Sequence, residues 1–367
     1  MKINKILHLY KTSNFDSYGG VEKFIHDISR NITPKNNNLR IYIYTFSKKI
    51  KRTTIKKIDN YILILVPYKI SLLSLPISFR YFFTFFFIKD RFQIFHIHYP
   101  FPYGDIFSIF IKGRIIVTYH SDIIKQKISK FLIIPFRNIL FNKAKKIIFT
   151  SNTYRKFSVI PHKFLFKSEV IYPALNPSDY ELTINKNIYS KPFDKYFIFI
   201  GGIRQYKGLD LLIETFNQIE SNLLIVASGQ NVKNIISDKI NNSKKNIKFV
   251  SNANHKHKNF LLRNSFAFIL PSVFKSEAFG YVLLEASFFS KPLITFNLNT
   301  GVNEINIHGV TGIVCKNISI LSLIEAINYL NKNTHLSINY GRQARKRCIE
   351  NFSYKKMINS YLEVYKF

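Results

Sequence analysis

Short apolar runs alternate with segments of helical period along this chain, and this alternation limits the fold more than any other feature. Residues 5–10 and 41–46 have the length of buried strands, and between them Val21, Phe24, Ile25, Ile28 and Ile32 recur at the spacing of one helical stripe. Similar apolar runs follow at 62–66, 92–98, 115–118 and 147–150. Strands that alternate with helices form parallel sheets covered by helices. We therefore expect an α/β fold.

The alternating pattern is interrupted once and then starts again. Residues 170–196 contain three prolines and several asparagines with little periodicity, which is typical of a connection between domains. Strand-like runs then return at 196–200, 223–227, 246–250, 266–270 and 292–296. We predict an N-terminal Rossmann-like domain at 1–178, a linker at 179–194, a second Rossmann-like domain at 195–350 and a C-terminal helix at 351–367. Ligands of such doubly wound sheets bind at the carboxyl ends of the strands.

The charge of the chain points to anionic partners. Its 54 Lys and Arg against 21 Asp and Glu give a formal net charge of +33. Nucleic acid, an acidic membrane face and phosphorylated small molecules all fit such a charge. The lysines are scattered and do not form a basic stripe interleaved with aromatic residues on one module, so nucleic-acid binding is disfavoured. The two cysteines, Cys315 and Cys348, have neither a disulfide nor a metal-site pattern, which favours a reducing compartment.

The most membrane-like segment lies at 70–92. Its apolar run is broken by Pro76 and Arg80, whereas a membrane span needs about 20 mostly apolar residues, so a span is not expected. Two alternatives remain, a buried helix and a basic, aromatic surface that lies on a bilayer.

Two glycine-containing loops are candidates for binding an anion. In YGGVEKF, at 18–24, glycines stand between the first strand and the first helix, but a tight structural turn explains them equally well. In FIGGIRQYKGLD, at 199–210, a strand runs into Gly201 and Gly202, and Arg204 and Lys207 follow just before a helix. Backbone amides, two cations and a helix dipole would meet at one spot, which suits a diphosphate. A basic turn without a ligand remains the alternative.

Two carboxylates, Glu277 and Glu285, stand eight positions apart in an apolar and aromatic stretch. Eight residues of helix rise ~12 Å, which is about the distance from the sugar to the ribose of a nucleotide sugar. Pro271 and Gly280 place Glu277 in the loop before a helix and Glu285 within it. Each acid could then accept hydrogen bonds from hydroxyls at one end of such a ligand. Two solvated helix acids are the alternative, and their apolar neighbours disfavour it.

With these motifs in view, the chain resembles glycosyltransferase family 4, the retaining enzymes of the GT-B fold. PSVFKSEAFGYVLLEASFFSKPLI is similar to the E-x7-E region of that family, and FIGGIRQYKG to its phosphate loop. GGVEKFIHDIS resembles the N-terminal glycine loop, HIHYPFPYGD and VTYHSDIIKQK the acceptor-side strands, and NFSYKKMINSYLEVY the closing helix. The resemblance covers almost the whole chain in order. It implies two Rossmann-like domains that face a central cleft, with the helix at 351–367 packing back toward the N-terminal domain.

Two segments suggest a narrower resemblance. YHSDIIKQK and NTGVNEINIHGVTGIV are most similar to GDP-mannose-dependent mannosyltransferases of bacterial O-antigen or capsule assembly. This resemblance implies an enzyme that moves a hexose from a nucleotide sugar onto a lipid-linked or polysaccharide acceptor. It also implies a cytoplasmic protein at the inner face of the cell membrane, where basic charge and the 70–92 segment would attract it to anionic lipid.

The family resemblance also implies residue roles. Glu277 would contact hydroxyls of the donor hexose, Lys207 would neutralise the β-phosphate as its bond to the anomeric carbon breaks, and His120 would lie near the transferred sugar. Glu285 would bind the ribose. The expected catalytic residues are His120, Lys207 and Glu277. The expected donor-binding residues are Gly19, Gly20, Arg204, Lys207, Glu277, Ala278, Phe279, Gly280 and Glu285.

At one position the chain departs from the family pattern. The family has Gly-Arg where this chain has Gly201-Gly202, so we expect Arg204 to supply the missing cation. No DxD motif is present, and the family needs no divalent ion, so neither a metal nor another cofactor is expected. His96 and His98 share one face at a strand end, but no third metal ligand is apparent in the sequence.

Alternatives to this function remain open. A UDP-sugar-dependent enzyme of the same fold and a catalytically silent, sugar-nucleotide-binding scaffold fit the same motifs. The two acids are expected too far apart for the pair of a retaining glycosidase, about 5 Å, so front-face transfer assisted by the leaving phosphate is the expected mechanism.

Overall fold

The structure is a computed structural model of the 367-residue chain. It describes residues 4–16, 19–35, 38–72, 75–122, 127–181, 189–229, 231–241, 243 and 245–366. Parts of three sequence motifs fall outside this range: Tyr18 of the first glycine loop, residues 123–126 of YHSDIIKQK, and 182–188 of the expected linker.

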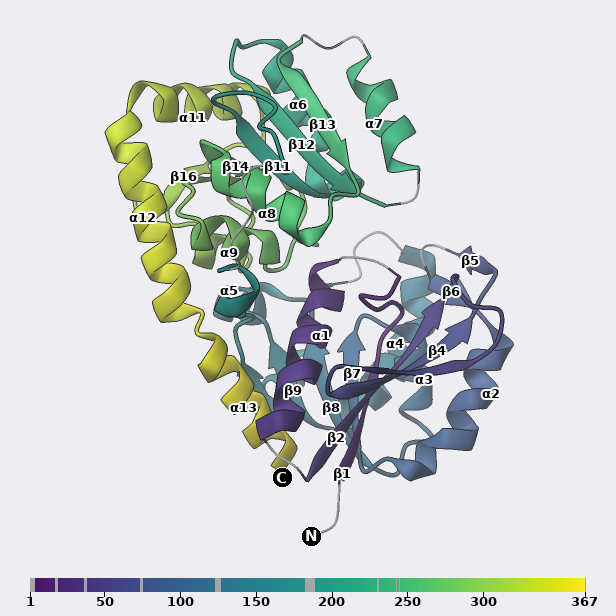
Figure 1. The fold of residues 1–367 in the computed structure, drawn as a ribbon. Helices are drawn as coiled ribbons and strands as arrows, with labels where there is room; N and C mark the ends of the chain where they lie inside the picture. Colours follow the sequence, from purple (N-terminus) through teal and green to yellow (C-terminus); the bar gives the residue numbers. More distant parts are fainter. Residues whose placement is uncertain are drawn as a thin grey trace. The chain divides into compact units, whose positions relative to one another are not determined.

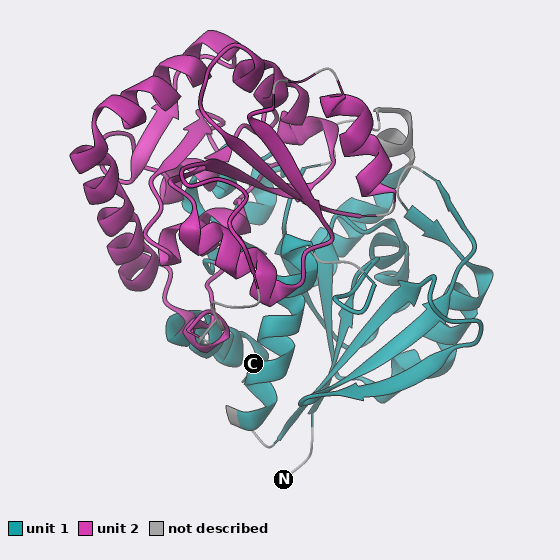
Figure 2. Cartoon of the chain, turned by 45° about the horizontal axis from the view of Figure 1, so that its top comes forward, with its two compact units in different colours: residues 1–172, 355–367 teal, residues 173–354 magenta. Residues whose placement is uncertain are grey.

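The chain forms two compact units (Figure 2). Unit 1 contains residues 1–172 and 355–367, and unit 2 contains residues 173–354. The sequence places its boundaries at 178, 194 and 350. The last helix, α13 (Tyr354–Lys366), belongs to unit 1 from residue 355 onward, so this unit is built from both ends of the chain.

Unit 1 is a twisted, mostly parallel sheet covered by helices (Figure 1). Within the described residues the strand order is β10-β9-β8-β7-β1-β2-β4-β3, and only the edge strand β3 runs antiparallel to its neighbour. The strands are β1 (Asn4–Leu9), β2 (Leu39–Ser47), β3 (Thr54–Ile58), β4 (Tyr61–Pro67), β7 (Ile94–Tyr99), β8 (Arg114–Tyr119), β9 (Ala144–Phe149) and β10 (Ser168–Val170). The helices other than α13 are α1 (Gly20–Ile32), α2 (Phe79–Ile88), α3 (Pro102–Phe107), α4 (Lys127–Lys143) and α5 (Asn152–Phe157).

The central strands of unit 1 are buried on both faces because helices cover both faces. Ile6, Leu7 and Leu9 of β1 are all buried. On one side, α1 buries the stripe predicted from its period, including Phe24, Ile25 and Ile28. The chain leaves β1 toward β2 and later returns to β7 on the other side of β1, so the strand order reverses between β1 and β7.

Unit 2 repeats this architecture with a parallel sheet in the order β13-β12-β11-β14-β15-β16 within the described residues. Its order reverses between β11 and β14. The strands are β11 (Phe197–Gly202), β12 (Leu223–Ser228), β13 (Ile247–Ser251), β14 (Ala267–Leu270), β15 (Leu293–Phe296) and β16 (Gly312–Cys315). The helices are α6 (Leu209–Asn217), α7 (Val232–Ile240), α8 (His255–Asn264), α9 (Tyr281–Phe288), α10 (Val302–Ile305), α11 (Ile320–Lys332) and α12 (Thr334–Asn351).

The 70–92 segment is a small hairpin followed by a helix. Strands β5 (Ile70–Leu72) and β6 (Leu75–Ile77) pair antiparallel, and Ser78 caps α2 by accepting a hydrogen bond from the backbone of Tyr81. Only Tyr81 and Phe85 of α2 are buried, so α2 is not the fully buried helix that was one alternative. Across the described residues, no helix has both the length and the apolar character that crossing a membrane requires.

Candidate active site

The reversal of strand order in unit 2 brings two predicted motifs together. Ligands bind in the crevice beside such a reversal, at the carboxyl ends of the strands. β11 ends at Gly202, where the second glycine loop begins, and β14 ends at Leu270, just before the loop that carries Glu277. The two loops are joined by a hydrogen bond of 2.8 Å from the Val273 amide to the Tyr206 carbonyl.

Lys207 and Glu277 meet between these loops. The Lys207 Nζ lies 2.5 Å from Glu277 Oε2, and the Ser272 hydroxyl donates to the same oxygen at 2.9 Å. Burial alone would lower the pKa of Lys207, but the adjacent Glu277 carboxylate outweighs it, so the pKa of the ammonium is raised. The side chains are 12% and 9% exposed, and Lys207 therefore stays charged in a largely desolvated place where an anion would interact with it strongly.

Two glycines with positive φ shape this site. Gly208 has φ +67°, and a Cβ there would fall on the carbonyl oxygen of Pro271, so only glycine lets the two loops approach so closely. Gly280 has φ +76° and precedes α9. Glu277 thus lies in the loop and Glu285 in the helix, as the positions of Pro271 and Gly280 predicted.

Glu285 is buried and held by two partners from distant segments. Its Oε1 accepts a hydrogen bond of 2.7 Å from the Tyr180 hydroxyl, and Lys258 Nζ lies 2.7 Å from Oε1 and 2.6 Å from Oε2. Lys258 projects from α8, whose first turn is capped by the Asn254 side chain. Tyr180, Lys258 and Ser272 were not predicted from the sequence. Asn254 was the only sequence signal for α8, since Asn is a preferred N-cap residue.

The remaining predicted donor residues differ in exposure. Arg204 is exposed at the start of the short 3-10 helix η5 (Gln205–Lys207). A Cβ at Gly202 would have only the Ser228 carbonyl oxygen within 4 Å, at 3.8 Å, so this strand end has room for a side chain. Ala278 and Phe279 are buried, and the Phe279 ring packs edge-on against Phe352 at 5.8 Å.

The predicted residues of unit 1 lie at the carboxyl ends of its central strands. Gly19 caps α1 and Gly20 is its first residue, following the loop after β1. The Glu22 carboxylate lies against Gly19 and accepts a hydrogen bond from Thr12. A Cβ at Gly19 would meet this carboxylate, which is the end of a flexible side chain.

His120 follows β8 and is buried among aromatic rings. Burial lowers its pKa to about 3, so its imidazole is neutral. Its Nε2 lies 3.0 Å from His98 Nδ1, and its ring packs edge-on against Phe24 at 5.3 Å. The third imidazole that the sequence did not reveal beside His96 and His98 is His8, on the neighbouring strand β1.

Two family descriptions match successive parts of the chain. Glycosyltransferase Family 4 matches residues 18–178, and Glycosyl transferases group 1 matches residues 183–347. The O-antigen chain mannosyltransferase C of Escherichia coli is 30% identical over 365 residues, 98% of this chain and 98% of that protein. The D-rhamnosyltransferase WbpZ of Pseudomonas aeruginosa is 26% identical over 349 residues, 94% of this chain and 91% of that protein.

A solved structure has the same fold. HepE from Anabaena, crystallised in complex with UDP-glucose, aligns with a TM-score of 0.75 at 15% identity over 99% of each chain. The architecture is therefore GT-B, with two doubly wound α/β units. Since the family descriptions match both units in order and a 30% identical relative spans the whole length, the chain belongs to glycosyltransferase family 4, the group 1 glycosyl transferases, and is a glycosyltransferase.

Proposed function

We propose that this glycosyltransferase moves a hexose, with retention of configuration, from a nucleotide sugar to a lipid-linked or polysaccharide acceptor in cell-surface glycan assembly. The observation that carries the proposal is the Lys207–Glu277 pair at the strand-order reversal of unit 2. The names of the two similar proteins, an O-antigen mannosyltransferase and a D-rhamnosyltransferase, favour this pathway class. We take mannose from GDP-mannose as the first donor to test.

The proposed donor pose follows from the charges of unit 2. The diphosphate lies at the end of β11, where Lys207 and the exposed Arg204 face it, and the hexose hydroxyls bind the Glu277 carboxylate. Glu285, fixed by Tyr180 and Lys258, binds the ribose hydroxyls. In unit 2, the backbone of Ala278, Phe279 and Gly280 is also proposed to contact the donor. In unit 1, Gly19 and Gly20 are proposed to bind its diphosphate.

In the proposed reaction, the bond between the anomeric carbon and the β-phosphate oxygen breaks as the acceptor oxygen bonds to the same face of the sugar. The acceptor hydroxyl gives its proton to the departing phosphate oxygen. Lys207 stabilises the charge that develops on that phosphate, and such electrostatic stabilisation by one donor is commonly worth ~3 to 4 kcal/mol. His120 contacts the transferred sugar.

The proposed reaction uses no divalent metal and no other cofactor, so an excess of EDTA should leave the rate unchanged.

We also propose that the protein works at the inner face of the cell membrane. Phe79, Phe83 and Phe87, the α2 phenylalanine row, recur every four residues and are 82%, 59% and 81% exposed. Arg80 and Arg91 are exposed nearby in sequence. An apolar row beside cations is typical of a helix that lies in the headgroup region of an anionic bilayer.

A thermal-shift screen with GDP-mannose, GDP-rhamnose and UDP-hexoses tests the donor, since a ligand that binds the folded state raises the melting temperature. The Anabaena complex makes UDP-glucose the second candidate. Turnover with the stabilising donor, followed by NMR of the new linkage, tests the reaction. An inverted linkage from an α-donor would refute retention, and binding without turnover on any lipid-linked saccharide would favour a silent scaffold.

A further inference from the structure

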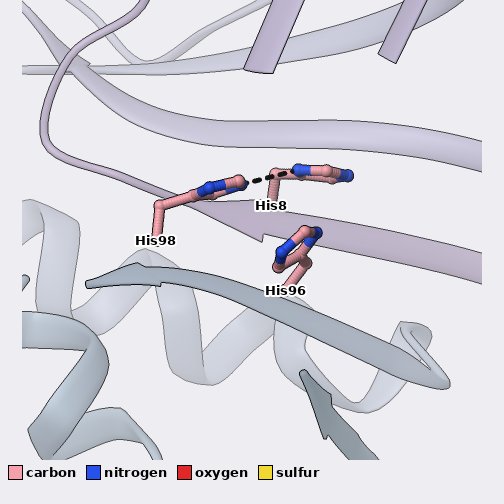
Figure 3. A group of neighbouring side chains, drawn as sticks. All are labelled: His8, His96 and His98. Atoms are coloured by element: carbon pink, nitrogen blue, oxygen red, sulfur yellow. Dashed lines mark hydrogen bonds between the residues drawn. The ribbon is translucent and has the colours of Figure 1, made fainter. Parts of the chain in front are cut away.

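Four buried histidines lie side by side in unit 1. His8 on β1 and His96 on β7 are register partners, His98 follows two residues later on the same face of β7, and His120 follows β8. Figure 3 shows the rings of His8, His96 and His98 gathered between the two strands. The side chain of Tyr365 from α13 reaches the same group. All of these residues belong to unit 1.

These side chains form one continuous hydrogen-bonded chain. His96 Nδ1 lies 2.6 Å from the Tyr365 hydroxyl, which lies 3.3 Å from His8 Nε2. His8 Nδ1 lies 2.9 Å from His98 Nε2, and His98 Nδ1 lies 3.0 Å from His120 Nε2. The other nitrogen of His96, Nε2, lies 2.7 Å from the Thr118 hydroxyl oxygen, so both ring nitrogens of His8, His96 and His98 have hydrogen-bond partners. We call this set the imidazole chain; its members, from the inner end, are Thr118, His96, Tyr365, His8, His98 and His120.

Within the run of directly linked imidazoles, His8, His98 and His120, the protons have only two consistent arrangements. A neutral imidazole donates from one nitrogen and accepts at the other, so each link fixes the direction of the next. Burial keeps the rings neutral: it lowers the pKa of His8 and His120 to about 3, and it lowers the pKa of His96 and His98 well below 6.5. Either the rings of this run all donate toward His120, or they all donate away from it.

The link between Tyr365 and His96 selects one arrangement. Hydroxyl donors make shorter hydrogen bonds than N–H donors, and the 2.6 Å distance from the Tyr365 hydroxyl to His96 Nδ1 has the length of an O–H donor bond. Tyr365 therefore donates to His96 and accepts from His8 Nε2. His8 Nδ1 must then accept from His98, and His98 Nδ1 from His120.

We propose that the imidazole chain is a positioning device that holds the proton of His120 on Nε2 and so presents its outer nitrogen, Nδ1, as a hydrogen-bond acceptor. Within the described part of the chain, Nδ1 of His120 has no protein partner. Its ligand must then be a donor, which on the proposed function is a hydroxyl of the transferred sugar. His8, His96, His98 and Tyr365 act through His120 and do not touch the ligand.

A metal site is the competing explanation for three of these histidines. His8, His96 and His98 each offer a nitrogen, and these atoms lie within 4.8 Å of one another. A metal needs the ring planes to converge on one point. Here the rings of His96 and His98 stack at 29° and those of His8 and His98 at 21°, which favours the hydrogen-bonded chain.

NMR of the full chain with 15N-labelled histidine tests the proposal directly. Long-range 1H–15N spectra report which nitrogen of each ring carries the proton, and side-chain resonance assignment identifies the rings without a variant. The expected result is a neutral His120 with its proton on Nε2. A proton on Nδ1 of His120 would overturn the proposal, and so would one equivalent of Zn²⁺ bound by His8, His96 and His98.

A pair of variants on one helix tests the coupling. Tyr365→Phe removes the hydroxyl between His96 and His8, whereas Tyr361→Phe removes a hydroxyl of the same helix that contacts Thr118, at the end of the chain farthest from His120, at 3.3 Å. Tyr365→Phe should shift His120 toward the other tautomer and lower kcat about tenfold, the size expected from one lost hydrogen bond, with KM nearly constant. Tyr361→Phe should alter neither. An unchanged His120 tautomer in Tyr365→Phe refutes the chain, whereas an altered tautomer in a protein that turns over no sugar donor refutes only the proposed function.

Discussion

The buried charges of Lys207 and Glu277 compensate each other. Each is less than one-eighth exposed, and removing one partner of such a pair leaves the other charge without compensation. A loss of activity in a single variant could therefore reflect lost stability as well as lost chemistry. Testing the role of Lys207 requires a change that removes its charge and also neutralises its partner.

The double variant Lys207→Met/Glu277→Gln separates these effects. Lys207→Met alone should destabilise the fold by about 3 kcal/mol, and the double variant should recover most of that stability while its transfer rate stays at least ~10²-fold below wild type. Lys239→Met, which breaks an exposed pair with Asp210, should change stability by less than about 1 kcal/mol and leave the rate unchanged. Urea titration and a donor-transfer assay measure both quantities. Wild-type activity in the double variant would exclude Lys207 from catalysis.

Arg204 and Gly202 allow a rescue experiment. If Arg204 supplies the cation that the family pattern has at the position of Gly202, Arg204→Ala should lower kcat/KM by about 10- to 100-fold. The room at Gly202 should let Gly202→Arg restore much of this loss in the Arg204→Ala background. The same substitution in wild type serves as the control for damage to the strand end. A fully active Arg204→Ala variant would contradict the assignment.

Gly208 and Gly309 form a matched pair for testing the close approach of the two loops. Both have φ near +70°, but a Cβ at Gly208 meets Pro271, whereas one at Gly309 meets nothing within 4 Å. Gly309→Ala should cost about 1 kcal/mol from the backbone conformation alone, and Gly208→Ala at least ~2 kcal/mol more from the clash. Equal losses of unfolding free energy in urea would show that the loops separate easily.

The site residues that lie near a proline or a glycine in the sequence could be predicted. Those that contact a partner distant in the sequence could not. Pro271 and Gly280 were enough to place Glu277 before a helix and Glu285 within it. Lys258 and Tyr180 reach Glu285 from 27 and 105 positions away, and no local pattern marks such a pairing. Which side chain neutralises a buried acid depends on the strand order, and a single sequence does not specify that order.

At the scale of elements, buried central strands were predictable and edge elements were not. The runs at 5–10 and 41–46 are apolar on both faces, whereas β3, TIKKI, alternates half-buried with exposed residues at a sheet edge. The short strands β5, β6, β10 and β16 were also missed, because three or four residues carry little periodicity. The polar stretch at 251–260 contains the first turn of α8, where the Asn254 side chain caps the helix although the composition is typical of a loop.

The two faces of α2 make the membrane proposal testable. Tyr81 and Phe85 pack inward, so the α2 phenylalanine row can be changed without opening the core. Phe79→Ser/Phe83→Ser/Phe87→Ser should weaken binding to vesicles of anionic lipid at least ~10-fold in flotation assays, since each loses the burial of an aromatic ring in the bilayer.

Phe166→Ser, at a site 85% exposed in the 3-10 helix η3 (His162–Lys167), is the control for general loss of surface hydrophobicity and should bind as wild type does. The binding that the triple variant retains should fall further when salt is raised, because salt screens the remaining attraction between the protein's cations and the anionic lipid. Equal binding of the triple variant and wild type would remove α2 from the proposed membrane contact.

For the whole molecule, the two units differ in the kind of titratable groups that they bury. Unit 1 buries four neutral histidines, and α13, from the C-terminal end of the chain, contacts two of them through Tyr365. Unit 2 encloses its buried charges as ion pairs, Lys207 with Glu277 and Lys258 with Glu285. Acid should therefore act on the two units differently.

Because burial lowers the pKa of these histidines below the ordinary 6.5, the unfolded chain binds protons that the folded chain does not as the pH falls below 6.5. Their contribution to stability is complete above pH 6.5 and is lost toward the folded-state values, which are about 3 for His8 and His120. Each histidine contributes about 1.4 kcal/mol per pH unit, so the four together should lower the free energy of unfolding of unit 1 by roughly 5 kcal/mol between pH 6 and pH 5.

Hydrogen exchange followed by mass spectrometry resolves the two units in the intact chain. Peptides of β1, β7 and α13 should lose protection at a higher pH than peptides of β11 and β14. The slope of the free energy of unfolding of unit 1 against pH gives the number of protons taken up on unfolding. His98→Gln should lower that number by about one, whereas His335→Gln, at an exposed position of α12, should leave it unchanged. The two units could instead lose protection at the same pH, with a pH dependence that His98→Gln does not alter. The buried imidazoles would then not control acid stability, and this would argue against neutral rings in the imidazole chain.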